Sequence, residues 1–310
     1  MRKPIDRVTR RTFIGSLAGL GAATVLPALA QAPAQGPILK KAIPRSGEQI
    51  PAVGLGTWIT FNVGNDERLR TARAQVMQAF FDRGGVLIDS SPMYGSSEAT
   101  IGYGLAHTKR AALFSASKVW TVLKPLGVSQ MEASRKYWGI ERFDLMQVHN
   151  LLDWSSHIET LKEMKALGRV RYIGITSSQG WRYGDMEKVM RTEPIDFVQF
   201  TYNVVDRDVE ERLLPLAAER GLAVIVNRPF QEGVLIDRMK HHPLPPWAGE
   251  IDCANWAQFL LKFIISHPAV TCTIPATRRV DHLEENMGAL RGRMPDADLR
   301  ARMARYAETV

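Results

Sequence analysis

Four side chains that could hold or move a proton stand at or just after the ends of short apolar runs. Asp89 follows the apolar residues 86–88, and Tyr94 comes five residues later, after a Ser-Ser-Pro break. Lys118 and His149 each end a later apolar run of the same kind. Short apolar runs that end in turn residues are typical of buried strands. The sequence therefore predicts four reactive groups at strand ends.

These residue types suit a proton relay. A lysine that ends an apolar strand is costly to bury without a carboxylate, and Asp89 is the available partner. A nearby Lys118 ammonium would lower the pKa of the Tyr94 phenol and stabilise the phenolate left when its proton leaves. A neutral His149 could orient a substrate carbonyl by a hydrogen bond. The alternative interpretation is that Asp89 caps the following helix and Tyr94 only packs over it.

The elements that would position these residues alternate between strand and helix. Apolar strands separated by helices predict a parallel sheet covered on both faces. Eight such units predict an α/β fold of the (β/α)8 TIM barrel type, with its active site where strands end and loops begin. An open doubly wound sheet is the alternative, but no Gly-x-Gly-x-x-Gly follows the first strand. The predicted strands cover 53–58, 86–89, 113–118, 145–149, 172–176, 197–200, 223–226 and 270–274.

A short N-terminal β-hairpin is expected ahead of the barrel, over 38–43 and 48–53 with a Pro-Arg-Ser-Gly turn between them. Predicted helices include 69–83, 156–167, 206–220 and 254–266. In the first of these helices, Ala72, Val76 and Phe80 fall on one face at helical spacing.

The first 30 residues are set apart from the fold. Arg10 and Arg11 precede a Gly- and Ala-rich apolar run without charges, which resembles a twin-arginine signal for the export of folded proteins. We expect a signal peptide at 1–30, a linker at 31–37 and the barrel at 38–310. This organisation predicts contact with the Tat export machinery, a periplasmic location and no stable membrane anchor.

Charge and cysteine content exclude several classes of protein. Removing residues 1–30 takes away five basic residues and one acidic residue, which lowers the net charge from +8 to +4. The remaining charge is spread along the chain, so nucleic acid is not an expected partner. Cys253 and Cys272 lack metal-ligand spacing, and we expect buried free thiols rather than a bridge. No metal site is predicted.

The strand-end residues, in this order and spacing, resemble the aldo-keto reductase family over residues 51–287. A second match is 274–286, Ile-Pro-Ala-Thr-Arg-Arg-Val-Asp-His-Leu-Glu-Glu-Asn, which resembles the segment that binds the adenosine phosphate end of the family's cofactor. The resemblance implies that Tyr94 is the general acid, that Lys118 and Asp89 tune it, and that His149 orients the carbonyl.

The resemblance also implies a set of cofactor-binding residues, among which Thr176 and Gln199 hold the nicotinamide carboxamide. Arg278 and Arg279 could fork onto a phosphate, which favours NADP(H) over NAD(H). The expected cofactor residues are Gly56, Thr57, Trp58, Thr176, Ser177, Gln199, Asn227, Arg228, Pro229, Ile274, Thr277, Arg278, Arg279, His282, Glu285 and Asn286.

Four aromatic residues, Trp58, Trp120, Trp154 and Phe230, are expected around the substrate pocket, which suits an apolar or aromatic carbonyl compound. We therefore predict a monomeric, NADP(H)-dependent oxidoreductase that reduces an aldehyde or ketone, with Tyr94 as general acid. The alternative of another class is a cofactor-binding or regulatory barrel with little turnover. A complete set of four strand-end residues favours catalysis.

Overall fold

Eight short parallel strands form the centre of the protein, whose computed structural model describes residues 36–310. The predicted signal peptide lies outside the described residues. The sheet runs in chain order, as the predicted barrel requires, and each predicted strand overlaps an observed one. The strands are β3 (Leu55–Gly56), β4 (Leu87–Asp89), β5 (Phe114–Val119), β6 (Phe143–His149), β7 (Val170–Thr176), β8 (Phe197–Thr201), β9 (Ala223–Asn227) and β10 (Cys272–Thr273).

The first and last strands meet, so the sheet closes into a barrel. The Gly54 N–H donates to the Thr273 carbonyl at 2.8 Å, and the Gly56 N–H donates to the Pro275 carbonyl at 3.1 Å. Glycine is needed at this seam, because a Cβ on Gly56 would lie 2.5 Å from the Ile274 carbonyl oxygen. The closed barrel excludes the open doubly wound alternative.

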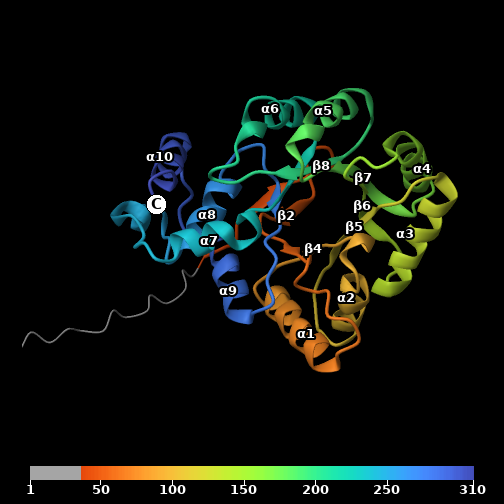
Figure 1. Ribbon diagram of the computed structural model, residues 1–310, viewed down its shortest axis with the longest axis horizontal. Helices are drawn as coiled ribbons and strands as arrows, with labels where there is room; N and C mark the ends of the chain where they lie inside the picture. The colour runs from red at the N-terminus through yellow and green to blue at the C-terminus, as the bar shows by residue number, and fades with distance from the viewer. Residues whose placement is uncertain (1–35) are drawn as a thin grey trace, which may run out of the picture. The chain divides into compact units, whose positions relative to one another are not determined.

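Helices surround the barrel (Figure 1). They are α1 (Glu67–Asp82), α2 (Ser97–Ala106), α3 (Lys124–Trp138), α4 (Trp154–Ala166), α5 (Tyr183–Thr192), α6 (Leu213–Arg220), α7 (Val234–Met239), α8 (Trp256–Ile265), α9 (Val280–Gly288) and α10 (Ala297–Ala307). The predicted helix 206–220 is split into a 3-10 turn, Asp208–Glu210, and α6. Pro215 falls in the first turn of α6, the part of a helix that tolerates a missing N–H, so the α-helix begins just before it.

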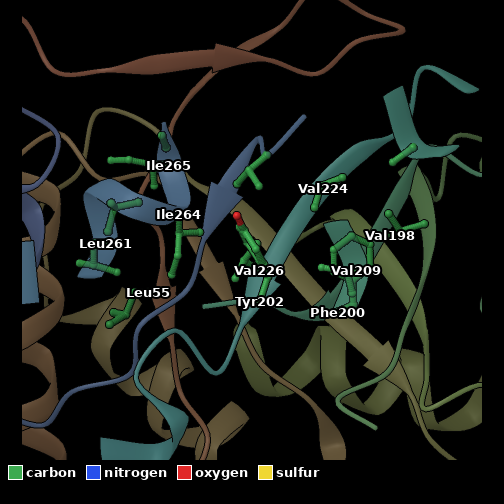
Figure 2. Packing of buried hydrophobic residues seen from close by; sticks show 14 of the residues in the cluster. Leu55, Val198, Phe200, Tyr202, Val209, Val224, Val226, Leu261, Ile264 and Ile265 are labelled. Atoms are coloured by element: carbon green, nitrogen blue, oxygen red, sulfur yellow. The ribbon is translucent and has the colours of Figure 1, made fainter. Parts of the chain in front are cut away.

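Alternation along each strand separates two hydrophobic clusters. Outward-facing residues of β8 and β9, among them Val198, Phe200, Val224 and Val226, belong to the same large cluster as Leu261 and Ile264 of α8 (Figure 2). The intervening residues of the same strands face the barrel interior, where Phe197, Ala223 and Ile225 join a second cluster. The period of two thus assigns each strand residue to one side of the barrel wall.

The predicted hairpin consists of β1 (Lys40–Ala42) and β2 (Gln49–Pro51), paired antiparallel. Ile43, which follows β1, and Ile50, within β2, belong to the interior cluster. Cys253 and Cys272 are buried and free, as expected. Within residues 36–310, no helix combines the length and apolar character needed to cross a membrane.

Candidate active site

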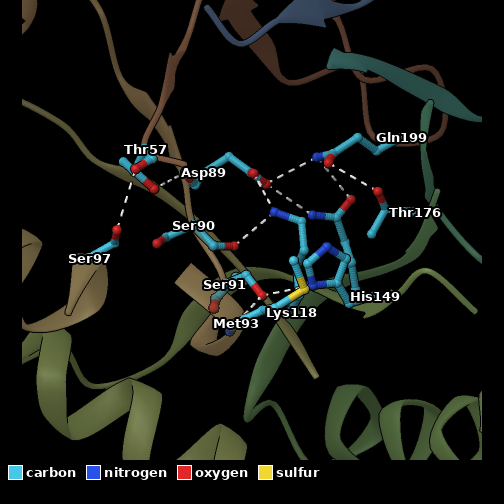
Figure 3. A network of polar contacts seen from close by, with 12 residues as sticks. Thr57, Asp89, Ser90, Ser91, Met93, Ser97, Lys118, His149, Thr176 and Gln199 are labelled. Carbon is cyan, nitrogen blue, oxygen red and sulfur yellow. Dashed lines mark hydrogen bonds and ion pairs between the residues drawn. The ribbon is translucent and has the colours of Figure 1, made fainter. Parts of the chain in front are cut away.

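An ion pair between Asp89 and Lys118 lies inside the barrel, near the carboxyl ends of β4 and β5 (Figure 3). Both side chains are almost fully buried, and the Lys118 ammonium also donates to the Ser90 carbonyl at 2.8 Å. A buried lysine requires such compensation, because burial without a partner disfavours its charged form. Asp89 therefore pairs with the lysine and does not act as the helix cap of the alternative interpretation.

Two glutamines complete the coordination of Asp89. Gln147 on β6 and Gln199 on β8 donate to the second carboxylate oxygen at 3.2 and 3.1 Å. Thr176 on β7 donates to Gln199 Oε1 at 3.0 Å, which fixes the orientation of that amide. The carboxylate thus accepts three hydrogen bonds from side chains of three strands (Figure 3). This network holds the lysine in one position.

Tyr94 ends a short 3-10 helix, Pro92–Tyr94, that follows β4. Ser91 caps this helix, because its hydroxyl accepts a hydrogen bond from the Met93 N–H. The Ser97 hydroxyl donates to the Tyr94 carbonyl at 2.9 Å, which fixes the backbone on the other side. The Lys118 ammonium lies 5.1 Å from the centre of the Tyr94 ring. The phenol and the ion pair therefore form one site.

His149 ends β6 beside Tyr94. The two ring centres are 5.7 Å apart and the rings meet edge to face. His149 Nδ1 lies 2.8 Å from the Ser91 hydroxyl oxygen. The structure therefore brings together all four residues predicted to be catalytic.

Burial controls the protonation of this site. It lowers the pKa of His149 well below its usual value, and the charge of Lys118 adds to the effect, so the imidazole is neutral. Burial raises the pKa of Tyr94 by more than Lys118 lowers it, so the phenol keeps its proton at neutral pH. Lys118 lowers the pKa of Tyr94, as expected, but desolvation outweighs the effect of the ammonium. For Lys118, burial lowers the pKa but Asp89 and Tyr94 raise it more, so the lysine stays charged.

A cavity of about 390 Å³ opens over these groups. Asp89, Tyr94 and His149 line it. Nine of the expected cofactor residues also line it: Gly56, Thr57, Trp58, Thr176, Gln199, Asn227, Arg228, Pro229 and Ile274. Its volume and its mixture of apolar walls with a few polar groups are typical of small-molecule sites.

Two of the four predicted aromatic residues, Trp58 and Phe230, belong to the cavity wall. Trp120 lies outside it and is 41% exposed, with its backbone N–H bonded to Gln130. Trp154 begins α4 and packs against the hydrophobic layer between barrel and helices. Ser177 also lies outside the lining, and its hydroxyl bonds to the backbone of Gln179.

The segment expected to bind the adenosine phosphate leads from β10 into α9. The Thr277 hydroxyl accepts from the Arg279 N–H at 3.2 Å, just before α9 begins. Arg279 forms an ion pair with Asp281, whereas Arg278 forms no ion pair with any residue of 36–310. His282 is exposed, Glu285 is half-buried and Asn286 is buried.

Several residues of the site were not predicted, among them Gln147 and Asn150. Gln147 stands two residues before His149, so strand alternation places it on the same interior face and could have revealed it. Asn150 directly follows His149 and lines the cavity, and its Oδ1 is buried without a hydrogen-bond partner among the described residues. Asn150 could have been predicted from its position at a strand end, as the four catalytic candidates were.

Residues 52–303 match the sequence pattern of the Aldo/keto reductase family. The chain belongs to this family. It is 28% identical over 275 residues to methylglyoxal reductase YeaE of Escherichia coli (strain K12), an alignment that covers 84% of this chain and 93% of that one. The expected enzyme family is thereby confirmed.

Solved structures give the same fold. An aldo-keto reductase from Klebsiella pneumoniae in complex with NADPH superposes with a TM-score of 0.71 at 23% identity, covering 87% of this chain and 96% of that chain. The Bombyx mori aldo-keto reductase AKR2E4 in complex with NADP has a TM-score of 0.68 at 20% identity, covering 88% and 93%. The predicted barrel is therefore confirmed.

Proposed function

We propose that this aldo-keto reductase uses NADP(H) to reduce an aldehyde or ketone to an alcohol. The observation that carries the proposal is the buried Asp89–Lys118 pair beside a protonated Tyr94 and a neutral His149 at the cavity. A phenol placed against a buried ammonium can give up its proton and leave a stabilised phenolate. A protein that only binds a cofactor has no need of this arrangement.

The residues fit a nicotinamide dinucleotide. Thr176 and Gln199 present polar groups to the cavity, and the Gln199 amide is held in one orientation by Asp89. Arg228 lies at the cavity edge, where it pairs with Glu232 at 2.9 Å, and Arg278, near the start of α9, has no ion-pair partner among residues 36–310. When bound, NADPH supplies the hydride for carbonyl reduction. These residues would hold the carboxamide and the phosphates.

In the proposed reaction, each group of the chain has one task. His149 donates a hydrogen bond to the carbonyl oxygen and orients it toward Tyr94. Tyr94 transfers its phenolic proton to that oxygen as negative charge develops on it. Lys118 stabilises the resulting phenolate, and Asp89 keeps the ammonium in place. The cavity walls exclude water from the reacting carbonyl.

Replacing Tyr94 with phenylalanine tests the proposal. We expect Tyr94→Phe to lower kcat by about 10²- to 10⁴-fold, the usual contribution of a general acid. The Kd of NADPH should change less than about twofold, because the ring remains. The first substrates to test are methylglyoxal, which appears in the name of the E. coli relative, and an aromatic aldehyde. The loss of NADPH absorbance measures turnover.

Tyr103→Phe is the matched control, because it removes a phenol on α2 whose partner is Thr71, outside the cavity. It should leave turnover unchanged. Near-normal turnover by Tyr94→Phe would remove Tyr94 from the mechanism. Tight NADPH binding without turnover of any carbonyl by the parent chain would instead favour a cofactor-binding module.

A further inference from the structure

Residues 274–286, the segment expected to bind phosphate and called the phosphate segment below, contain two arginines, of which one is paired with a carboxylate. The Arg279 guanidinium binds the Asp281 carboxylate through two nitrogens, one of them at 2.9 Å. This pair is exposed and carries no net charge, so it attracts a phosphate only weakly. Arg278 remains as the one guanidinium of this segment without an ion-pair partner among residues 36–310. A phosphate dianion would need a second cation from elsewhere.

Arg73 on α1 is such a cation. Its side chain is only 7% exposed, and Nε donates to the Thr60 carbonyl at 2.6 Å. Thr60 lines the cavity, so Arg73 lies directly behind the cavity wall. No carboxylate lies within ion-pair distance of Arg73 in the part of the chain that the structure describes. A buried guanidinium without a counter-charge is unfavourable, and an anion nearby removes the penalty.

Arg73 and Arg278 belong to neighbouring elements. Helix α1 packs beside α9 (Figure 1), and Arg83 and Glu284 join the two helices by an ion pair of 2.5 Å. Arg278 stands immediately before α9, on the segment that adjoins the cavity through Ile274 and Ala276. Burial lowers the pKa of Arg73, and the positive charge of Arg278 lowers it further. The two guanidinium groups therefore repel each other across this contact.

We propose that Arg73 and Arg278 together bind the 2′-phosphate of NADP(H), so that Arg73 determines the preference for NADPH over NADH. This inference rests on the proposed use of NADP(H). A dianion between two guanidinium groups neutralises both and converts their repulsion into attraction. NADH lacks that phosphate and would leave the two charges uncompensated. Arg73 is thus a specificity-determining residue contributed by a helix outside the phosphate segment.

Titration of the full chain with NADPH and with NADH, followed by quenching of tryptophan fluorescence, tests this inference. We expect Arg73→Gln to raise the Kd of NADPH about 10- to 100-fold, as for a lost charged hydrogen bond, and that of NADH less than about twofold. Arg73→Lys keeps the positive charge but lacks the planar guanidinium that can form two parallel hydrogen bonds, so it should raise the Kd of NADPH about three- to tenfold. Arg83→Gln, on the same helix but paired with Glu284, should leave both affinities unchanged.

The outcomes separate this inference from the proposed function. Equal losses for the two cofactors would mean that Arg73 only holds the Thr60 carbonyl, and unchanged affinities would remove it from the site. If Arg278→Gln weakens NADPH selectively and neither Arg73 variant does, the inference fails while the proposed cofactor stands. If the parent binds both cofactors equally, the proposed preference itself fails. Should Arg73→Gln not fold, the Arg73→Lys titration decides.

Discussion

Among single residues, Ser91 holds the ring of the orienting histidine in place. Its hydroxyl oxygen accepts from the Met93 N–H and lies 2.8 Å from His149 Nδ1. The hydroxyl can donate its proton to Nδ1 while its oxygen accepts from the Met93 N–H, an arrangement that matches a histidine acting as donor to the substrate. The proton of the neutral imidazole is then on Nε2, the ring nitrogen left for a substrate oxygen. A serine that caps a short helix thus also orients the catalytic histidine.

A second histidine couples stability to pH. His267 Nδ1 accepts a hydrogen bond from the Ala269 N–H, and burial together with Arg300 lowers the pKa of His267 to about 4. Between about pH 6.5 and pH 4 the unfolded chain binds a proton at this residue and the folded chain does not. The stabilising contribution is therefore complete above pH 6.5 and is lost as the pH falls. His149, with its lowered pKa, acts in the same direction.

We expect the free energy of unfolding of His267→Gln to depend less on pH than that of the parent over this window, because glutamine does not titrate. Urea unfolding at pH 4.5, 5.5 and 7 measures the difference, at pH values chosen to span roughly the two pKa values. His241→Gln, which replaces an exposed histidine, is the control and should follow the parent. Parallel pH profiles for parent and His267→Gln would refute this coupling.

At the element scale, a buried carboxylate joins three pieces of the barrel wall. Glu98 on α2 accepts hydrogen bonds from Ser117 on β5 at 2.6 Å and from Ser134 on α3 at 2.7 Å. Trp138 at the end of α3 donates to the same carboxylate at 3.2 Å. Ser117 immediately precedes Lys118, so this network anchors the strand that carries the catalytic lysine. Its donors satisfy a group whose burial would otherwise be costly.

The packing of α2 on α3 leaves no room for a side chain at Gly102. A Cβ there would lie 1.9 Å from the Tyr137 carbonyl oxygen, so the helices must separate to admit it. We expect Gly102→Ala to lower the free energy of unfolding by about 2 kcal/mol or more, as overpacking does. Gly184→Ala on α5 is the matched control, since no atom lies within 4 Å of its Cβ position. That variant should be neutral or up to about 1 kcal/mol more stable. Thermal and urea unfolding compare the two, and equal stabilities would contradict the packing argument.

At the scale of the whole molecule, closure of the barrel assembles the site. The seam between β3 and β10 bends the sheet until the carboxyl ends of all eight strands surround one opening. Asp89, Lys118 and His149 come from three consecutive strands, and Gln199 reaches Asp89 from a strand further round the barrel. In an open sheet these residues would be spread along an edge.

The N-terminal segment bears on where in the cell the protein acts. We propose that the chain leaves the cytoplasm already folded, through the twin-arginine route, and acts in the periplasm. A chain exported unfolded would have to find its dinucleotide outside the cytoplasm, whereas a folded one can carry it. The proposal rests on the Arg10-Arg11 pair ahead of an uncharged apolar run. These residues lie outside the described part of the chain.

Replacing Arg10 and Arg11 together by lysine should trap the precursor in the cytoplasm with its activity retained. The twin-arginine route recognises the two arginines, whereas the general secretory route also accepts lysine in a charged segment. Fractionation of cells that express the double variant measures the distribution. Arg2→Lys with Arg7→Lys, which spares the pair, is the control and should be exported like the parent. Mature Arg10→Lys/Arg11→Lys protein in the periplasm at the parental level would exclude the twin-arginine route.

The eight-unit barrel and the four catalytic candidates can be predicted from the sequence alone. Both depend on local patterns: apolar runs of strand length, helical spacing between them, and reactive residues at or just after the ends of three of the strands. The predicted strand boundaries differ most from the observed ones at the seam, where β3 and β10 are only two residues long. Pairing there depends on contact between the two ends of the sheet. The helix expected at 206–220 was likewise shortened by Pro215.

Which charges are compensated and which side chains reach the cavity depends on contacts between distant parts of the chain. Asp281 pairs with Arg279, while Arg73, one of many arginines in the sequence, lies beside the cavity, where it donates to the carbonyl of the cavity-lining Thr60. Trp120 and Trp154 carry the same sequence signal as Trp58 but lie outside the cavity. Strand periodicity is fixed by neighbouring residues, whereas ion-pair partners and cavity walls depend on loops and helices that approach each other only when the barrel closes.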